Sequence, residues 1–290
     1  MTAHTPPKTK RRWWRAAAIW ALLLALGYCG GVVYMWATQD SRIFLPRSLD
    51  VARGDAVLVQ VPGARHVWLT AADGTRLHAW WQSATPGQPS NKVLLYFGGN
   101  AEDVHWRLAR AGDMGGWDVL LVDYRGYGLS PGSPSQAALQ ADALLWHDQL
   151  ARGQLVGVAQ PKAIAVMGTS LGSYFASHVA AQRPVAAVVL ATPFDSVRDY
   201  IQGRMSVVPV GLILRHPLHS LAHAGDVKAP TLFLVAQQDN VFPPERSRRL
   251  FDAWAGQPRQ WVLVPQANHN TVSAQPLYWQ ALASFLQGLR

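Results

Sequence analysis

Apolar segments of two lengths alternate along most of the chain, beginning near residue 65. Short runs of strand length are separated by longer segments with apolar residues at helical spacing. The predicted strands lie within residues 92–97, 117–123, 163–167, 185–192, 229–238 and 259–267. The predicted helices lie within residues 135–151, from 171 onward, 244–255 and 276–289. Buried strands that alternate with helices predict an α/β fold, with a mostly parallel sheet covered by helices on both faces.

The remaining segments suggest how the chain is divided. Residues 65–82 read as two strands joined at Asp73-Gly74, a dipeptide typical of tight hairpin turns. Residues 38–65 are expected to form a connector, residues 66–290 the α/β domain, and residues 195–225 a small lid within it. The apolar residues of this lid would either line an acyl pocket or pack the lid on the domain. They are Met205, Val207, Val208, Val210, Leu212 and Leu214.

An uncharged apolar stretch near the N-terminus predicts one transmembrane helix over residues 16–37, since about 20 apolar residues span a bilayer. A basic tail, residues 1–15, precedes it, so the positive-inside rule places the N-terminus in the cytosol. The domain then lies on the far side of the membrane, which is the periplasm in a bacterium. A cleaved signal peptide is the alternative. The long run and the absence of a small-residue cleavage site at its end, "VVYMWATQD", favour an uncleaved signal anchor.

The net charge of +9 is concentrated in this tail, whose five basic residues leave +4 for the remainder. The excess therefore flanks a membrane helix, and we expect no nucleic-acid partner. With 49% hydrophobic and 15% charged residues, the chain is too apolar for disorder and too charged for a multi-span membrane protein. Cys29 is the only cysteine, so no internal disulfide can form.

A single serine lies between two glycines at the end of the strand predicted over 163–167. The sequence Gly168-Thr169-Ser170-Leu171-Gly172 is a G-x-S-x-G motif, followed by a predicted helix. In this context the serine occupies a strained strand-to-helix turn that lifts its hydroxyl above the sheet. We therefore expect Ser170 to be a nucleophile, with Gly168 and Gly172 allowing close backbone approach.

A serine nucleophile requires a base and an acid that orients the base. Asp239 and His269 each follow a later predicted strand, in the chain order Ser, Asp, His that this motif requires. His269 is expected to be the base and Asp239 the acid. Asp195 follows an earlier strand and is a rival acid, and Asp239 could instead cap the next helix.

Stabilising the oxyanion of such a reaction requires two backbone donors. The N–H of Leu171 follows the nucleophile directly. The second donor is expected in the loop after residues 92–97, where Asn100 ends the sequence Phe97-Gly98-Gly99-Asn100.

The chain resembles the α/β-hydrolase superfamily over roughly residues 66–290. The matching motifs are "DYRGYGLSPGSPS", "MGTSLGS", "QQDNVFPPERSRRLF" and "NHN". They are similar to a branch of membrane-anchored serine hydrolases, the alpha/beta hydrolase domain-containing proteins, which include protein depalmitoylases. The resemblance implies an eight-stranded sheet whose second strand is antiparallel, with Ser170, Asp239 and His269 as triad. Family members usually carry His-Gly before the oxyanion residue, and here Gly98 stands in place of the histidine.

Two other groups of residues are expected to have structural roles rather than roles in catalysis or metal binding. Asp123 and Arg125, in "DYRGYG", are expected to hold their loop rather than touch substrate. His216, His219 and His223 are near helical spacing, but Pro217 interrupts them and no carboxylate or cysteine cluster accompanies them. We therefore expect no metal site and no cofactor.

The sequence thus predicts a membrane-anchored serine hydrolase, carboxylesterase- or thioesterase-like, that cleaves an ester, thioester or amide through an acyl-enzyme. Its substrate would be a small or lipid-like acyl compound near the bilayer. Two alternatives stay open: an inactive binding or scaffold protein on the same fold, and a serine peptidase. A dehalogenase is disfavoured because it would need aspartate in place of Ser170.

Overall fold

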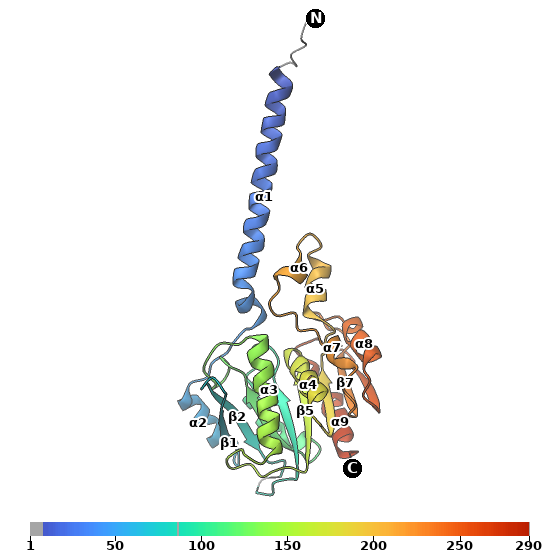
Figure 1. Cartoon of the computed structure of the whole chain (residues 1–290). Coiled ribbons are helices and arrows are strands. Elements are labelled where there is room, and N and C mark those ends of the chain that lie inside the picture. The colour runs from blue at the N-terminus through green and yellow to red at the C-terminus, as the bar shows by residue number, and fades with distance from the viewer. Residues whose placement is uncertain (1–7, 86, 290) are drawn as a thin grey trace, which may run out of the picture.

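The computed structural model describes residues 8–85 and 87–289, and one eight-stranded sheet forms its centre (Figure 1). The strand order is β1-β2-β4-β3-β5-β6-β7-β8. β2 is antiparallel to β1 and β4, and the other neighbouring strands are parallel. The mostly parallel sheet with an antiparallel second strand is therefore confirmed. The strands are β1 Arg65–Thr70, β2 Arg76–Gln82, β3 Lys92–Phe97, β4 Asp118–Asp123, β5 Ala163–Thr169, β6 Ala187–Ala191, β7 Thr231–Ala236 and β8 Arg259–Val264.

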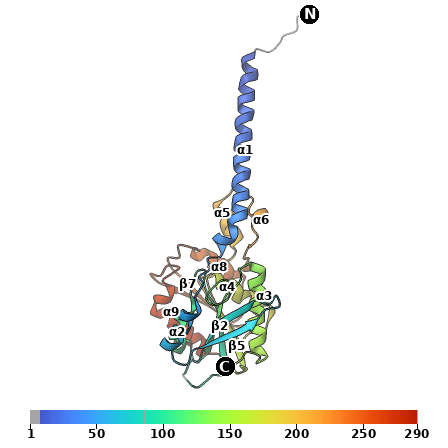
Figure 2. The same ribbon diagram turned by 90° about the vertical axis from the view of Figure 1, so that its left-hand side faces the viewer.

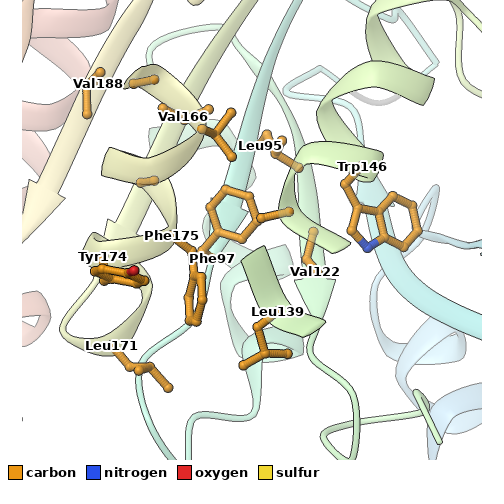
Figure 3. Close-up of a cluster of buried hydrophobic side chains, with 14 of the residues drawn as sticks. Leu95, Phe97, Val122, Leu139, Trp146, Val166, Leu171, Tyr174, Phe175 and Val188 are labelled. Atoms are coloured by element: carbon orange, nitrogen blue, oxygen red, sulfur yellow. The ribbon is translucent and has the colours of Figure 1, made fainter. Parts of the chain in front are cut away.

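Helices cover both faces of this sheet. On one face, α3, α4 and α8 pack with one hydrophobic cluster, and on the other η1 and α9 pack with a second cluster. Figure 3 shows the first cluster, where Trp146 of α3 and Phe175 of α4 lie against strand side chains. The helical elements are α1 Lys8–Ile43, α2 Val51–Gln60, η1 Val104–Asp113, α3 Gln136–Ala151, α4 Leu171–Gln182, α5 Val197–Arg204, α6 Val210–Ile213, α7 Leu221–Ala224, α8 Pro244–Ala253, η2 Val272–Ala274 and α9 Pro276–Gln287.

The strands and helices form where their sequences favour them. β4, β6 and β7 are buried along their whole length, which explains their continuous apolar sequences. α3 begins after Ser135, whose hydroxyl accepts a hydrogen bond from the N–H of Ala138, and α8 begins with Pro244, a residue favoured in the first turn. The strands and helices predicted between residues 65 and 289 are all present.

In the described part of the chain, six helical elements lie where the sequence predicts none: α2, η1, η2 and, within the predicted lid, α5, α6 and α7. α2 has 10 residues and lies within the segment 38–65, the expected connector, whose first residues belong to the end of α1. Asp50 caps it by accepting from the N–H of Arg53, and Val57 packs into the core. η1 follows the loop that contains Asn100 and buries Val104 and Leu108 under the sheet.

The N-terminal helix α1 projects far from the domain (Figures 1 and 2). It contains a stretch, Arg12–Ile43, that is long and apolar enough to cross a membrane. The first seven residues of the predicted basic tail lie outside the described residues, and α1 begins within that tail at Lys8. At its domain end, α1 runs beside the segment that carries α5 and α6, within the predicted lid 195–225.

The strand order brings the predicted site residues to one edge of the sheet. β3 and β5 are parallel neighbours, and their register pairs Phe97 with Gly168. The loop after β3 therefore lies beside the turn after β5. β7 and β8 are also parallel neighbours, so the loops that carry Asp239 and His269 leave the same edge.

Candidate active site

Ser170 occupies a strained turn between β5 and α4. Its φ of 50° and ψ of −114° lie outside the regions that non-glycine residues prefer. The turn is held because the N–H of Ser170 donates to the carbonyl of Ala191 at 2.8 Å. The two flanking positions must be glycine, because neither has room for a side chain. A Cβ on Gly168 would lie 2.0 Å from the carbonyl oxygen of Gly172, and one on Gly172 would lie 2.0 Å from that of Phe97.

A chain of hydrogen bonds joins Ser170, His269 and Asp239. The Nε2 atom of His269 lies 2.8 Å from the Oγ of Ser170, and its Nδ1 lies 2.7 Å from Oδ2 of Asp239. The other carboxylate oxygen of Asp239 accepts from the N–H groups of Val241 and Phe242, at 2.9 and 2.8 Å. Both carboxylate oxygens of Asp239 are therefore engaged, and this fixes the ring of His269 toward the serine hydroxyl.

Asp195, the rival acid, lies elsewhere. Its carboxylate pairs with the guanidinium group of Arg246 at 3.1 Å and accepts from the N–H of Ser196 at 2.7 Å. Asp195 is only 2% exposed, so this ion pair lies within the domain. The structure brings Asp239, and not Asp195, to His269.

The two expected oxyanion donors border the same site. Leu171 is the first residue of α4, and the first N–H groups of a helix have no partner within it. Asn100 borders both cavities that open at Ser170. The side chain of Asn100 is committed elsewhere, because it donates to the carbonyl of Ile43 and accepts from the N–H of Leu45. Only the backbone N–H of Asn100 is therefore suited to donate to an oxyanion, as the sequence predicts.

Glu102 braces the loop after β3, a role that the sequence reasoning missed. Its carboxylate accepts from the N–H of Gly99 at 2.6 Å, from the hydroxyl of Tyr96 at 2.8 Å and from Nε of Arg107 at 2.8 Å. At Gly98, where the family resemblance leads us to expect histidine, a Cβ would lie 2.5 Å from Val104. Val104 fills the space beside Gly98, and Glu102 supplies the polar support. The only sequence signal is that Glu102 is one of two glutamates in the chain.

The surroundings of Arg107 and Tyr96 keep both side chains protonated, because each pKa is raised. Burial works to lower the pKa of Arg107, but Glu102, Tyr96 and Tyr278 together outweigh it, so the pKa of Arg107 lies above its ordinary value. Burial also raises the pKa of Tyr96, which keeps its hydroxyl protonated as a donor. Arg107 further donates to the Oγ1 of Thr169, the residue before the nucleophile, at 3.3 Å.

Two cavities meet at Ser170 and differ in polarity. One, of about 320 Å³, is bordered by polar side chains that include Arg107, Asn270 and Ser273. The other, of about 340 Å³, is bordered mainly by apolar ones, among them Val197, Ile201 and Phe242. Ser170 and His269 border both. A bound acyl compound could therefore place its carbonyl at Ser170, with an apolar part on one side and a polar part on the other.

Of the predicted lid 195–225, the residues that border the apolar cavity at Ser170 are Val197, Tyr200, Ile201 and Leu218. Of the six apolar residues singled out in the sequence, Met205, Val208, Val210 and Leu214 border a separate cavity against α1. Val207 and Leu212 are exposed.

The other residues singled out have structural partners. Asp123 accepts from Nδ1 of His78 at 2.7 Å, and Arg125 pairs with Asp142 at 2.6 Å. His216 pairs with Asp40 at 2.9 Å, and His223 packs against His178. Among the residues that the structure describes, no group of three or more His, Cys, Asp or Glu side chains is placed to hold a metal ion.

Comparisons with known proteins agree with this architecture. A family model described as "alpha/beta hydrolase fold" matches residues 92–210. The chain is 36% identical over 250 residues to the uncharacterized protein Rv2307c of Mycobacterium tuberculosis, and the match covers 86% of each chain. It is 27% identical to the alpha/beta hydrolase domain-containing protein WAV2 of Arabidopsis thaliana, over 89% of this chain and 90% of that protein.

Among solved structures, the esterase Pf2001 of Pyrococcus furiosus is similar with a TM-score of 0.66. The similarity covers 84% of this chain and 97% of the esterase, at 16% sequence identity. At this identity the similarity concerns the fold.

Proposed function

The chain belongs to the α/β-hydrolase superfamily, and we propose that within it the protein is a membrane-anchored serine hydrolase, carboxylesterase- or thioesterase-like, that cleaves an ester, thioester or amide. The observation that carries the proposal is the continuous hydrogen-bonded chain from Ser170 through His269 to Asp239. It is supported by the strained turn at Ser170 and by the two cavities that meet there.

The geometry fits a two-step acyl transfer. Ser170 Oγ attacks the substrate carbonyl carbon while His269 Nε2 takes the hydroxyl proton, and Asp239 stabilises the imidazolium ring. The N–H groups of Leu171 and Asn100 bind the oxyanion of the tetrahedral intermediate. When this intermediate collapses, His269 gives the proton to the leaving group and an acyl-serine ester remains. His269 then takes a proton from a water molecule that attacks the ester, and gives this proton to Ser170 Oγ as the acid is released, which restores both residues.

The polarity of the two cavities orients the substrate. The apolar cavity beside Val197 and Ile201 suits the acyl group, and the polar cavity beside Arg107 and Asn270 suits the leaving group. The substrate class that fits is an acyl compound with an apolar acid part and a polar alcohol, thiol or amine part.

Contacts of α1 with the domain support an uncleaved anchor. The hydroxyl of Tyr28 donates to the carbonyl of Val207 at 2.7 Å, and the side chain of Gln39 bonds the backbone of Ile213 and Arg215. A cleaved leader would need no such complementarity with the mature domain. The domain would then lie across the membrane from the basic tail.

The proposal is tested by fluorophosphonate labelling and by turnover of short p-nitrophenyl esters, using the full chain in detergent. We expect the wild-type protein and a Ser133→Ala control, changed at an exposed serine, to be labelled and active. Ser170→Ala should lose both properties. A folded wild-type protein that takes no label would favour the scaffold alternative, and an active Ser170→Ala variant would exclude Ser170 as nucleophile.

A further inference from the structure

A separate apolar cavity, of about 180 Å³, lies between α1 and the α5–α6 segment. We call it the anchor cavity. Met35 and Ile43 border it from α1, and Met205, Val208 and Ile213 border it from the other side. The membrane helix is therefore one wall of an apolar space on the domain.

The anchor cavity adjoins the apolar cavity at Ser170. Arg42, Ile43 and Ile201 border both of them. The guanidinium group of Arg42 is engaged on α1, where it donates to the side-chain oxygens of Thr38 and Tyr34 at 3.0 and 3.3 Å. The methylene stem of Arg42 can thus line an apolar passage while its charge is held outside.

The lid tip beside the anchor cavity lies next to the apolar part of α1. Tyr28, which bonds the carbonyl of Val207, falls within the predicted membrane span 16–37. The side chains of Val207 and Leu212 at this tip are 78% and 88% exposed. Exposed apolar side chains beside a membrane helix are expected to enter the lipid interface. The anchor cavity would therefore open at the membrane surface, on the side of the domain from which α1 rises (Figure 1).

The end of α1 is also tied to the loop that carries the expected oxyanion donor. The side chain of Asn100 donates to the carbonyl of Ile43 at 2.8 Å and accepts from the N–H of Leu45 at 2.9 Å. Phe44, between them, is 1% exposed. The helix end is thereby held in a fixed position relative to Ser170.

From these contacts we propose that α1 is part of the substrate site: a long acyl chain extends from Ser170 through the apolar cavity into the anchor cavity, toward the bilayer. This inference rests on the proposed function and names its substrate class as long-chain acyl lipids. The carbonyl would reach Ser170 while the far end of the chain stays next to the membrane. A long acyl chain could then pass from the lipid into the protein without being fully transferred into water, which avoids the cost of exposing its apolar surface.

The test compares two tryptophan substitutions on α1 in the full-length protein in detergent micelles. Met35→Trp fills the anchor cavity, whereas Val33→Trp changes a side chain that is 61% exposed on α1. In the lid, Ile213→Trp likewise fills the anchor cavity, and Leu212→Trp is the matched control at an exposed side chain. The substrates are p-nitrophenyl butyrate and p-nitrophenyl palmitate, and fluorophosphonate labelling reports the state of Ser170.

We expect Met35→Trp and Ile213→Trp to lower kcat/KM for the palmitate ester at least about tenfold, because methylenes of the chain lose their apolar contacts. Butyrate turnover and labelling should stay at the wild-type level, and the Val33→Trp and Leu212→Trp controls should match wild type on both esters. An unchanged preference between palmitate and butyrate in both cavity variants would overturn the proposal, as would an equal loss on both esters. Failure of wild type to take the label would instead refute the underlying serine hydrolase.

Discussion

At the scale of single residues, we assign the orientation of His269 to Asp239 and a structural role to Asp195. Asp239→Asn keeps the size of the side chain but weakens its hold on the required tautomer of His269. We expect kcat to fall by about 10³–10⁴-fold. Asp195→Asn should leave kcat within a few-fold of wild type and lower thermal stability, because it breaks the buried pair with Arg246.

The measurement is steady-state kinetics on a short ester beside a thermal unfolding curve for each variant. Should Asp195→Asn lose more kcat than Asp239→Asn, the assignment of the acid would be wrong.

Glu102 is expected to act as a positioning residue for the oxyanion loop. Glu102→Ala removes the acceptor of the Gly99 N–H, and we expect kcat to fall about 10- to 100-fold with little change in KM. Glu102→Gln offers an oxygen at the same place and should recover most of kcat, although both variants lose the ion pair with Arg107. The control is Glu245→Gln, which changes an exposed glutamate. Equal losses of kcat in the Ala and Gln variants would argue against positioning.

The sequence predicts some of these residues and not others, for physical reasons. Gly168 and Gly172 follow from local geometry, since a Cβ at either position would clash with the backbone, and Ser170 is recognised by its place between them. Asp239 and Asp195 both follow strands, so only the three-dimensional path of their loops decides which one reaches His269. Glu102 stayed unnoticed because its role depends on contacts with separate segments rather than on any spacing along the chain.

At the scale of elements, α4 should make stability depend on pH through His178. Burial, followed by the nearby His223 and Arg183, lowers the pKa of His178 to about 4, from an ordinary value of 6.5. Between these values the unfolded chain binds a proton that the folded protein does not. Folding stability through His178 is therefore full above pH 6.5 and decreases as the pH falls toward 4, by at most about 3 kcal/mol.

Thermal unfolding measured at several pH values between 7 and 4.5 checks this expectation. His178→Gln should show a shallower loss of Tm with acidification than wild type. Part of the slope should persist, because the pKa of His223 is lowered by burial as well. Parallel curves for the two proteins would contradict the assignment to His178.

Element prediction succeeded where the apolar pattern was strong. The buried strands β4, β6 and β7 have continuous apolar sequences, and α8 and α9 carry clear helical patterns. α2 was missed because its segment "VARGDAVLVQ" contains glycine, polar residues and β-branched valines, and Val57 is the residue that packs into the core. η1 was missed because it is a 3₁₀ helix, whose spacing differs from the α-helical pattern.

At the scale of the whole molecule, the anchor is expected to place the domain across the membrane from the basic tail. Cys29 is the only cysteine, so a Cys29→Ala background allows single reporters. In intact bacterial cells we expect a membrane-impermeant maleimide to label Ser133→Cys in the domain. Thr9→Cys, in the tail, should be labelled only after the inner membrane is permeabilised. The reverse pattern would contradict the orientation.

The sequence predicts the sheet, the anchor helix and the order of the triad, but not how the anchor meets the domain. The contacts of Tyr28, Gln39 and Ile43 with the lid and with Asn100 join segments that are far apart along the chain. No local pattern encodes such pairings, because each residue has an ordinary explanation on its own helix. The proposed role of α1 in binding acyl chains therefore depends on the structure.

The most direct test of the central claim is to locate the acyl group on the protein. The full-length chain is mixed with a p-nitrophenyl ester, quenched with acid within the first turnover and digested with trypsin. We predict that the tryptic peptide of residues 163–198, which contains the uncleaved Arg183–Pro184 bond, gains the mass of the acyl group, and that fragmentation places it on Ser170. Ester turnover with an acyl group trapped on another residue, or with none trapped under single-turnover conditions, would contradict the account.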